Sequence, residues 1–236
     1  QMCRTGKING VNYQDSLFRG IEVDGDSVDS DKIQFERALV NSQISNILKQ
    51  AGVDTSSIKE ECTFTVDPYS YEITVDGVDE KTKVLMQNAL NVGNNGKNLY
   101  KHIYYCSTQD GCESSQVTEE SKMKYEAYHQ VYSYTGYELD KLEEKNGTYY
   151  TESGENILDL VDSAVESSGK VPKEFKQQMN NWIHDLVSTI STRGWNNVPD
   201  MTLSILYGKS GLKDMNQLIT YQYEVDRMNR QWYSVL

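Results

Sequence analysis

Apolar residues recur at helical spacing over most of the chain. In residues 31–51 they form one stripe, made of Ile33, Val40, Ile44, Ile47 and Ala51. Gly52 follows this stripe at the position where a helix commonly ends. The same periodicity predicts further helices over residues 78–91, 97–105, 118–136, 155–167, 172–192 and 214–235.

Two regions show the alternation of a strand instead. Phe64 and Val66 alternate with polar residues, and after Asp67-Pro68-Tyr69-Ser70 the alternation resumes through residues 71–76, which predicts a β-hairpin. Residues 201–207 form a second strand signal, and 148–151 a brief one after Asn146-Gly147. Because a lone hairpin is marginally stable, it must pack on helices or join a further strand. The predicted fold class is α+β, predominantly helical, with a β-hairpin and at least one further strand packed on helices.

The same patterns divide the chain into three parts. Residues 1–30 are rich in Gly and Asp and predict an irregular N-terminal arm. Its stretch Asp24–Asp31 has oxygen ligands at odd spacing but lacks the Gly and the final Glu of a calcium loop, so we interpret it as a polar loop in which Asp29 or Ser30 caps the next helix. Residues 31–213 form the main globular α+β domain.

The third part, residues 214–236, predicts a C-terminal helix. It carries an apolar stripe of Leu218, Tyr221, Val225, Met228, Trp232 and Val235. Such a stripe can dock on the parent domain or associate with a partner or a second copy of the chain. We expect docking, because apolar stripes usually serve the nearest core.

Charge narrows the classes of partner. The 236 residues contain 23 Lys and Arg against 35 Asp and Glu, a net charge of −12. Nucleic-acid binding depends on basic side chains that neutralise phosphates, so we expect no nucleic-acid partner. No apolar run approaches the ~20 residues that cross a bilayer, so we expect no membrane insertion.

The 4 cysteines leave the redox compartment open. Cys106 and Cys112 flank a polar turn that brings them within range of a disulfide, and we predict this bridge if the protein is exported. The alternative is two free thiols in a reducing compartment. We expect a secreted or cell-surface location slightly more than a cytoplasmic one.

No specific catalytic or cofactor motif is present. The 3 histidines have no metal-ligand spacing, and there is no Gly-x-Ser-x-Gly elbow, P-loop or Gly-x-Gly-x-x-Gly, so we expect no cofactor and no metal site. His102 and Cys106 fall four apart on one predicted helix, and acidic pairs such as Glu60-Glu61 recur. These residues keep open an alternative, a hydrolase that uses carboxylates or a Cys–His pair.

Tyrosines supply the candidate binding residues. Tyr125, Tyr128 and Tyr132 share one face of the predicted 118–136 helix, where they can stack on a protein or a carbohydrate. The interpretation that we favour for these rings is structural: a helix face half buried against the hairpin. Together with the missing catalytic motifs, this pattern predicts a non-catalytic interaction or structural domain.

Three stretches together resemble a known family. They are Phe64–Val75, Ala89–Leu99 and Pro199–Ile205, and they are similar to an uncharacterised domain-of-unknown-function family of Firmicutes proteins over roughly residues 30–215. The resemblance implies a low-GC Gram-positive source. It implies no activity and supplies no catalytic residues.

Overall fold

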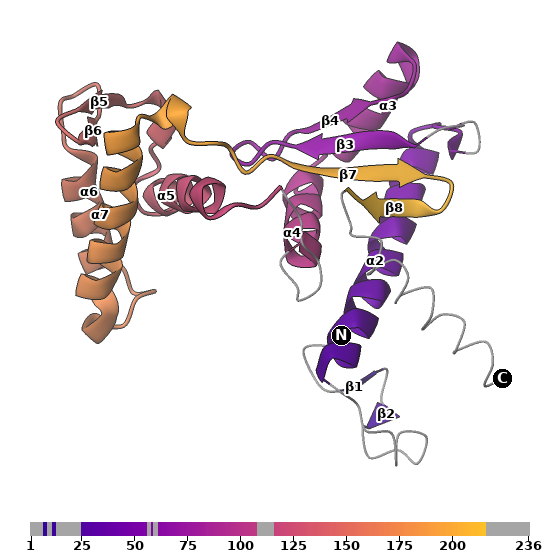
Figure 1. Ribbon diagram of the computed structural model, residues 1–236, viewed down its shortest axis with the longest axis horizontal. Helices are drawn as coiled ribbons and strands as arrows, with labels where there is room; N and C mark the ends of the chain where they lie inside the picture. The colour runs from indigo at the N-terminus through magenta and orange to yellow at the C-terminus, as the bar shows by residue number, and fades with distance from the viewer. Residues whose placement is uncertain are drawn as a thin grey trace. The chain divides into compact units, whose positions relative to one another are not determined.

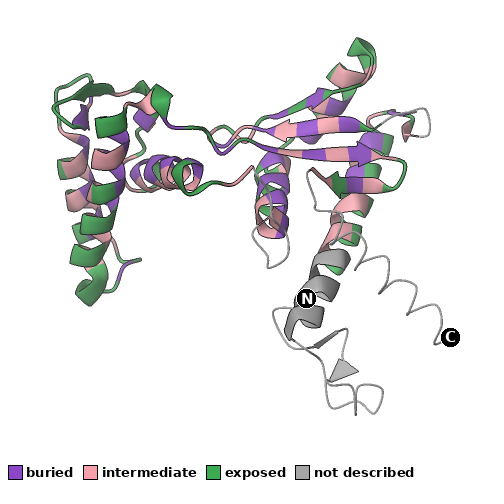
Figure 2. Cartoon of the chain, in the orientation of Figure 1, coloured by how far each residue is buried: buried purple, intermediate pink, exposed green. Residues whose placement is uncertain are grey.

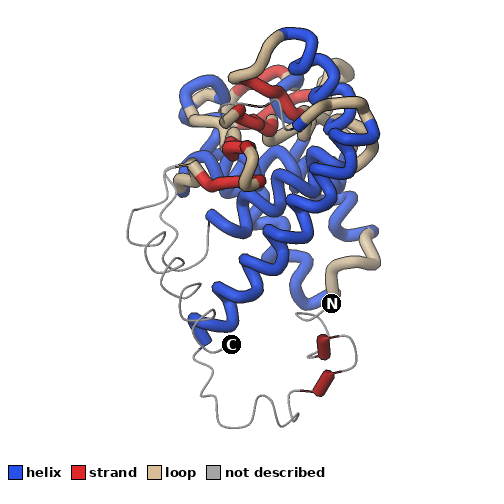
Figure 3. The backbone as a smooth tube through the Cα atoms, turned by 90° about the vertical axis from the view of Figure 1, so that its right-hand side faces the viewer, coloured by secondary structure: helices blue, strands red, loops and turns tan. Residues whose placement is uncertain are grey.

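The computed structural model describes residues 7–8, 11–12, 25–55, 58, 61–107 and 116–215. The chain divides into two compact units. Unit 1 comprises Gln1–Thr63, Val75–Glu113 and Ile205–Leu236, and unit 2 comprises Phe64–Thr74 and Ser114–Ser204. Helices make up most of the described chain, and strands are few (Figure 3). The predicted α+β, predominantly helical class is confirmed.

Unit 1 is built around a long helix. This helix, α2 (Gly25–Gln50), contacts α3 (Glu80–Leu90), α4 (Asn95–Ser107) and strand β8 (Gly211–Asp214). The short strands β1 (Lys7–Ile8) and β2 (Val11–Asn12) form an antiparallel pair. Gly52, with φ of 78°, adopts the left-handed conformation that follows the end of a helix, as its position in the sequence predicts.

The main sheet has four antiparallel strands in the order β4-β3-β7-β8. Its strands are β3 (Cys62–Val66), β4 (Ile73–Asp76), β7 (Leu203–Gly208) and β8 (Figure 1). Buried and partly exposed residues alternate along β3 and β7 (Figure 2). Phe64, Val66, Ile73 and Val75 are fully buried, so the predicted alternation marks the inward face correctly. The division between the units falls within β3, β4 and β7.

Unit 2 is a helical cluster with its own core. Helices α5 (Glu119–Thr135), α6 (Ile157–Ser167) and α7 (Lys176–Arg193) contact one another, and β5 (Glu143–Lys145) pairs with β6 (Thr148–Tyr150). Three 3₁₀ turns complete it: η3 (Leu139–Lys141), η4 (Lys173–Phe175) and η5 (Trp195–Asn197). The core centres on Ala127, Val131, Val161, Ile183 and Val187.

Local capping explains why α5 begins and ends where the sequence predicts. Thr118 and Ser121 form a reciprocal capping box, and Glu119 and Glu120 place negative charge at the first turn. Gly136 closes the helix at φ of 75°. Asn146 and Gly147 both have positive φ, which suits the tight turn between β5 and β6.

Three expectations are wrong. Helix α2 begins at Gly25, so Asp29 and Ser30 lie inside it instead of capping it. A capping side chain accepts from the amides that a helix leaves unpaired in its first turn, and residues 29 and 30 lie beyond the first turn of α2. Residues 211–214 form β8, where the pattern indicates only a strand end and a helix start. The helical pattern over residues 172–192 places the apolar Phe175 and Trp182 on its inward side, yet they are 53% and 37% exposed.

The predicted boundaries at residues 30/31 and 213/214 lie within α2 and β8 respectively. The range 31–213 includes residues of both units. Residues 216–236, which hold the apolar stripe of the predicted C-terminal helix, lie outside the described residues. Among the helices that are described, none is both long enough and apolar enough to cross a bilayer.

Candidate functional site

The turn between β3 and β4 is fixed by its own side chains. The Asp67 carboxylate accepts hydrogen bonds from the backbone amides of Tyr69 (2.9 Å) and Ser70 (2.7 Å). The Tyr71 amide donates to the carbonyl of Asp67 at 3.1 Å. Tyr71 has φ of 59°, a left-handed conformation that is costly for a bulky side chain. Because such strain persists only where the surroundings impose it, Tyr71 is a candidate for a functional role.

The strained Tyr71 reaches helix α5. Its hydroxyl lies 2.8 Å from the Tyr125 hydroxyl and 3.3 Å from His129 Nε2, and its ring stacks on the His129 ring at 5.4 Å. His129 Nε2 also lies 2.8 Å from the carbonyl oxygen of Pro68. A carbonyl oxygen can only accept, so the Nε2 atom carries a proton and donates it. The hairpin turn and α5 are therefore joined by a chain of polar side chains.

A second link runs from the turn to a buried lysine. The Tyr69 hydroxyl donates to the Asp200 carboxylate at 2.6 Å, and Lys124 Nζ lies 2.7 Å from the same carboxylate. Lys124 also donates to the carbonyl of Val198 at 2.8 Å and lies 4.4 Å from the ring centre of Trp195. The Lys124 side chain is 2% exposed and that of Asp200 is 48% exposed, so a buried cation is paired with a carboxylate that water can reach.

The aromatic rings of this region pack on one another. Tyr69 lies 4.5 Å from Tyr128 and 5.5 Å from Trp195, and Tyr128 stacks on Tyr132 at 6.3 Å with the rings nearly parallel. We call the set the tyrosine cluster: Tyr69, Tyr71, Tyr125, Tyr128, Tyr132, His129 and Trp195. Tyr128 is 5% exposed, whereas Tyr132 is 49% exposed. The cluster thus has a packed base and a partly exposed outer ring.

Burial raises the pKa of three phenols in the cluster, those of Tyr69, Tyr71 and Tyr128. It raises the pKa of Tyr69, with a further contribution from the Asp200 carboxylate, and raises the pKa of Tyr128 to about 12. Burial also raises the pKa of Tyr71, although the hydrogen bond with Tyr125 opposes this rise. At neutral pH these hydroxyls are therefore hydrogen-bonding groups and not nucleophiles or bases.

The predicted binding residues all lie in the cluster. Tyr125 is half-buried and Tyr128 buried, and both contact residues of the hairpin turn, while Tyr132 is exposed. Sequence reasoning did not include Tyr69, Lys124 or Asp200 among the site residues. One signal was present: Lys124 falls three and four residues before Ala127 and Tyr128 on the buried face of α5, where a lysine is unusual.

A further polar group, in unit 1, surrounds the predicted Cys–His pair. Cys106 Sγ lies 3.8 Å from His102 Nε2, and both residues are buried. Arg37 pairs with Asp214 at 2.5 Å and also interacts with Cys106. Burial, followed by the charge of Arg37, lowers the pKa of His102 to about 4. We call Arg37, His102, Cys106 and Asp214 the buried polar network.

Other candidate residues are dispersed. Cys112 lies outside the described residues, so a Cys106–Cys112 disulfide stays a prediction. His184 is half-exposed on α7 and pairs with Asp162 at 2.8 Å. In the part of the chain that is described, no three His, Cys, Asp or Glu side chains gather as a metal site would require.

Comparison with known proteins gives a family without an assigned activity. Residues 1–230 match the model of a family described as a domain of unknown function, DUF4885. The chain belongs to this family. It is 30% identical over 217 residues to "Uncharacterized protein YbdO" of Bacillus subtilis (strain 168), a match that covers 92% of this chain and 54% of that protein. The chain thus spans about half the length of this relative. No solved structure matches the chain.

Membership of the DUF4885 family confirms the resemblance to an uncharacterised family. The stretches that carry the resemblance include four residues of the site. Asp67, which fixes the turn, lies in Phe64–Val75 together with Tyr69 and Tyr71, and Asp200 lies in Pro199–Ile205. Neither the family description nor the relative names a substrate or partner. Roles for these residues therefore rest on the geometry of this DUF4885 chain.

Proposed function

We propose that this DUF4885 domain is a non-catalytic protein-interaction domain that contacts its partner through the tyrosine cluster. The observation that supports this most strongly is Tyr71, which is held in a strained left-handed conformation while its hydroxyl bonds to α5. Strain of this kind serves to position a group in advance. The rigid base places the exposed Tyr132 ring as an anchor, and tyrosine is among the residues that dominate binding energy at protein interfaces.

The packing of the rings favours a protein partner over a carbohydrate. A sugar stacks on an open aromatic face. Within the cluster, ring faces already meet other rings: Tyr71 covers His129, and Tyr128 stacks on Tyr132. The exposed Tyr132 ring and the half-exposed Asp200 carboxylate are accessible to a partner. This mixture of aromatic and polar contacts suits a protein interface.

The alternative, a hydrolase, has weaker support in the chemistry of its candidate groups. A hydrolase that uses a Cys–His pair needs an accessible thiol and an imidazole that accepts its proton near working pH. Cys106 is 2% exposed, and the lowered pKa of His102 disfavours the protonated imidazole. In the tyrosine cluster, the Asp200 carboxylate is held between Tyr69 and Lys124.

Photo-crosslinking tests the proposal. A photoreactive phenylalanine analogue replaces Tyr132 in one variant and Phe175, an equally exposed aromatic residue of unit 2, in the other. We expect a defined partner protein to be cross-linked in cells only from position 132. Calorimetry with the purified partner should then show at least tenfold weaker binding for Tyr132→Ala and unchanged binding for Phe175→Ala.

Other results would contradict the proposal. Equal cross-linking from both positions would indicate non-specific contact. Saturable binding of isolated cell-wall glycans that is lost in Tyr132→Ala, without any protein partner, would replace the protein by a carbohydrate. Hydrolysis in a broad substrate screen that Cys106→Ala abolishes would favour the enzymatic alternative.

A further inference from the structure

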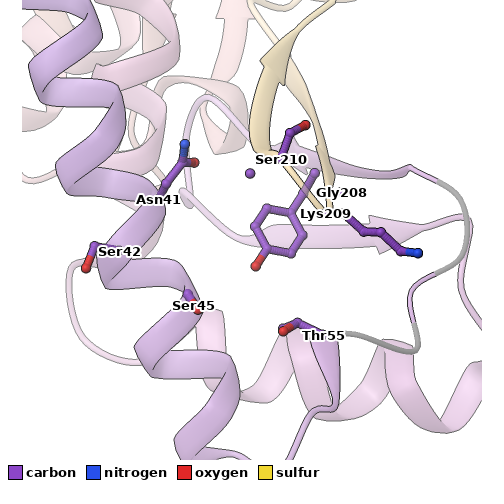
Figure 4. A pocket seen from close by; sticks show the side chains of 9 residues that line it. Asn41, Ser42, Ser45, Thr55, Gly208, Lys209 and Ser210 are labelled. Carbon is purple, nitrogen blue, oxygen red and sulfur yellow. The ribbon is translucent and has the colours of Figure 1, made fainter. Parts of the chain in front are cut away.

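A hollow of about 630 Å³ lies in unit 1. It is lined from α2, from the residues that follow this helix, and from the turn between β7 and β8 (Figure 4). The lining residues are Asn41, Ser42, Ser45, Thr55, Tyr207, Gly208, Lys209, Ser210 and Gly211. The volume falls within the range of sites for small molecules.

At one wall of the hollow, Asn41 of α2 packs closely against Gly211 and Leu212 of β8. Asn41 Oδ1 accepts a hydrogen bond from the Leu212 amide at 2.8 Å, which ties α2 to β8. Gly211 has φ of 92°, and a Cβ atom placed there would lie 2.5 Å from Asn41 Nδ2. Any larger residue at position 211 would therefore collide with Asn41 and also adopt a strained backbone. Because Asn41 Oδ1 is used in this contact, its Nδ2 group remains as a donor at the wall.

The side chains that line the hollow carry mainly hydroxyl groups, together with one cation, Lys209. The structure records no hydrogen bond from the hydroxyls of Ser42, Ser45, Thr55 or Ser210 to another described residue. In Figure 4, Thr55 carries its hydroxyl on the side that faces α2, across the open space from Ser45. Hydroxyls that both donate and accept suit a ligand that is itself rich in hydroxyls.

Charge at the hollow differs from charge in the chain as a whole. The chain has a net charge of −12, yet no carboxylate is among the described residues that line the hollow, and Lys209 contributes an ammonium. A nearby acid, Glu61, packs against Gly208 and pairs with Lys213 at 3.5 Å. Lys209 is exposed and extends away from α2 (Figure 4), so its long side chain is available to a negatively charged group at the rim.

We propose that this hollow binds a small phosphorylated sugar or sugar alcohol. The hydroxyls of Ser45 and Thr55 bond to the sugar hydroxyls, and Lys209 turns back to pair with the phosphate. The Gly211–Asn41 contact holds α2 and the β7–β8 turn at the spacing that the ligand needs. The site is separate from the tyrosine cluster, so either proposal can fail without the other.

Calorimetry on the full chain tests this site with three probes: glucose 6-phosphate, glucose and inorganic phosphate. We expect glucose 6-phosphate to bind with a Kd on the order of 0.1–1 mM and each fragment at least tenfold more weakly. Lys209→Ala should weaken glucose 6-phosphate about tenfold and leave glucose unchanged. Ser45→Ala with Thr55→Ala should weaken both sugar probes by about tenfold or more.

Two matched variants serve as controls. Lys170→Ala removes another exposed lysine and Ser163→Ala another exposed serine hydroxyl, both in unit 2, and neither should change binding. Absence of saturable binding of glucose 6-phosphate overturns the proposal, as does binding that the hollow variants leave unchanged. Phosphate that binds as well as glucose 6-phosphate overturns the sugar contacts, and glucose that binds as well overturns the role of Lys209.

Discussion

Each unit of the molecule holds a cation against a carboxylate, but the two pairs are shielded differently. In unit 2 the Lys124 side chain is 2% exposed and Asp200 is 48% exposed. In unit 1 Arg37 and Asp214 are 13% and 19% exposed, so neither partner reaches much water. Lys124 has further contacts with the Val198 carbonyl and the Trp195 ring. Arg37 Nε, by contrast, is buried without a hydrogen-bond partner in the described structure.

This difference suggests different roles. A pair with one exposed carboxylate can connect a buried lysine to a binding surface, and Asp200 does so through Tyr69. A pair in which both charges are shielded fixes a junction, and Arg37–Asp214 fixes the end of β8 to α2. Breaking one partner of a shielded pair leaves the other charge without compensation, which costs more than losing an exposed pair.

The largest effect should come from removing residues 216–236. Phe35 and Leu39 of α2 are 50% and 51% exposed and lie four residues apart, so they share one helix face, on the side of α2 opposite Arg37. The predicted C-terminal helix is able to cover this apolar face. We propose that this helix docks there, as its apolar stripe predicts.

Truncation after Met215 tests this docking while keeping the Arg37–Asp214 pair. Burial of Met228 and Trp232 would contribute roughly 2–3 kcal/mol each, so the free energy of unfolding should fall by several kcal/mol in urea denaturation. Light scattering should show an unchanged oligomeric state. Unchanged stability with conversion of a dimer to a monomer would make the segment an association element instead.

The second largest effect should come from removing either partner of the Lys124–Asp200 pair in unit 2. The two substitutions should lower the unfolding free energy by different amounts. Asp200→Ala leaves the buried Lys124 ammonium without its carboxylate and Tyr69 without its acceptor, so we expect a loss of about 3 kcal/mol in unfolding free energy. Lys124→Met keeps most of the buried volume and leaves Asp200 to water, so about 1–2 kcal/mol should be lost. Tryptophan fluorescence during denaturation measures the unfolding free energy of both variants. Equal losses would contradict the argument that the buried Lys124 needs its partner more than the half-exposed Asp200 does.

Much of the helical framework follows from local signals. The capping residue Thr118, the C-terminal Gly136 and the Asn146-Gly147 turn each act within a few residues, so the sequence predicts α5, this turn and the short strand after it, but not β5. Strand β8 was missed because its pairing, which places Gly208 opposite Gly211, depends on the Asn41–Gly211 contact with a distant helix. No local pattern reports such a contact.

The candidate site was only partly predictable for the same reason. A tyrosine stripe at helical spacing placed Tyr125, Tyr128 and Tyr132 on one helix. Tyr71 of the cluster and Asp200, which bonds to Tyr69 of the cluster, lie 54 and 75 residues away from Tyr125 in the sequence. Only the tertiary fold brings these segments to α5, and the strain at Tyr71 is visible only in its backbone angle.

A smaller effect should follow from lowering the pH, which should destabilise unit 1 before unit 2 because unit 1 holds the buried His102. Burial lowers the pKa of His102 to about 4, below its usual value near 6.5. Between these values the unfolded imidazole binds a proton that the folded one does not, so stability falls as the pH falls through this window. The His102 contribution should be on the order of 2–3 kcal/mol between pH 7 and 4.

The variant His102→Gln isolates that contribution, because carboxylates titrate in both proteins. Its stability should depend less on pH than that of the native chain over this range. Hydrogen exchange by mass spectrometry should locate the native loss of protection in α4 of unit 1 before α5 of unit 2. Identical pH profiles for the two proteins would show that His102 is not held in its neutral form.

The smallest effect concerns the hydroxyl pair that joins the hairpin turn to α5. Tyr71→Phe and Tyr125→Phe each remove one partner of the 2.8 Å contact, and each should lower the unfolding free energy by about 1 kcal/mol. Because both changes break the same bond, the double variant should lose little more than either single one. The difference between its loss and the sum of the two single losses is the coupling energy of the pair. Additive losses would mean that the hydroxyls do not bond to each other, and the strained Tyr71 backbone would then have no positioning role at α5. If the coupling is present, partner binding should weaken in Tyr71→Phe even though the exposed Tyr132 ring is unchanged, since the base that positions this ring has loosened.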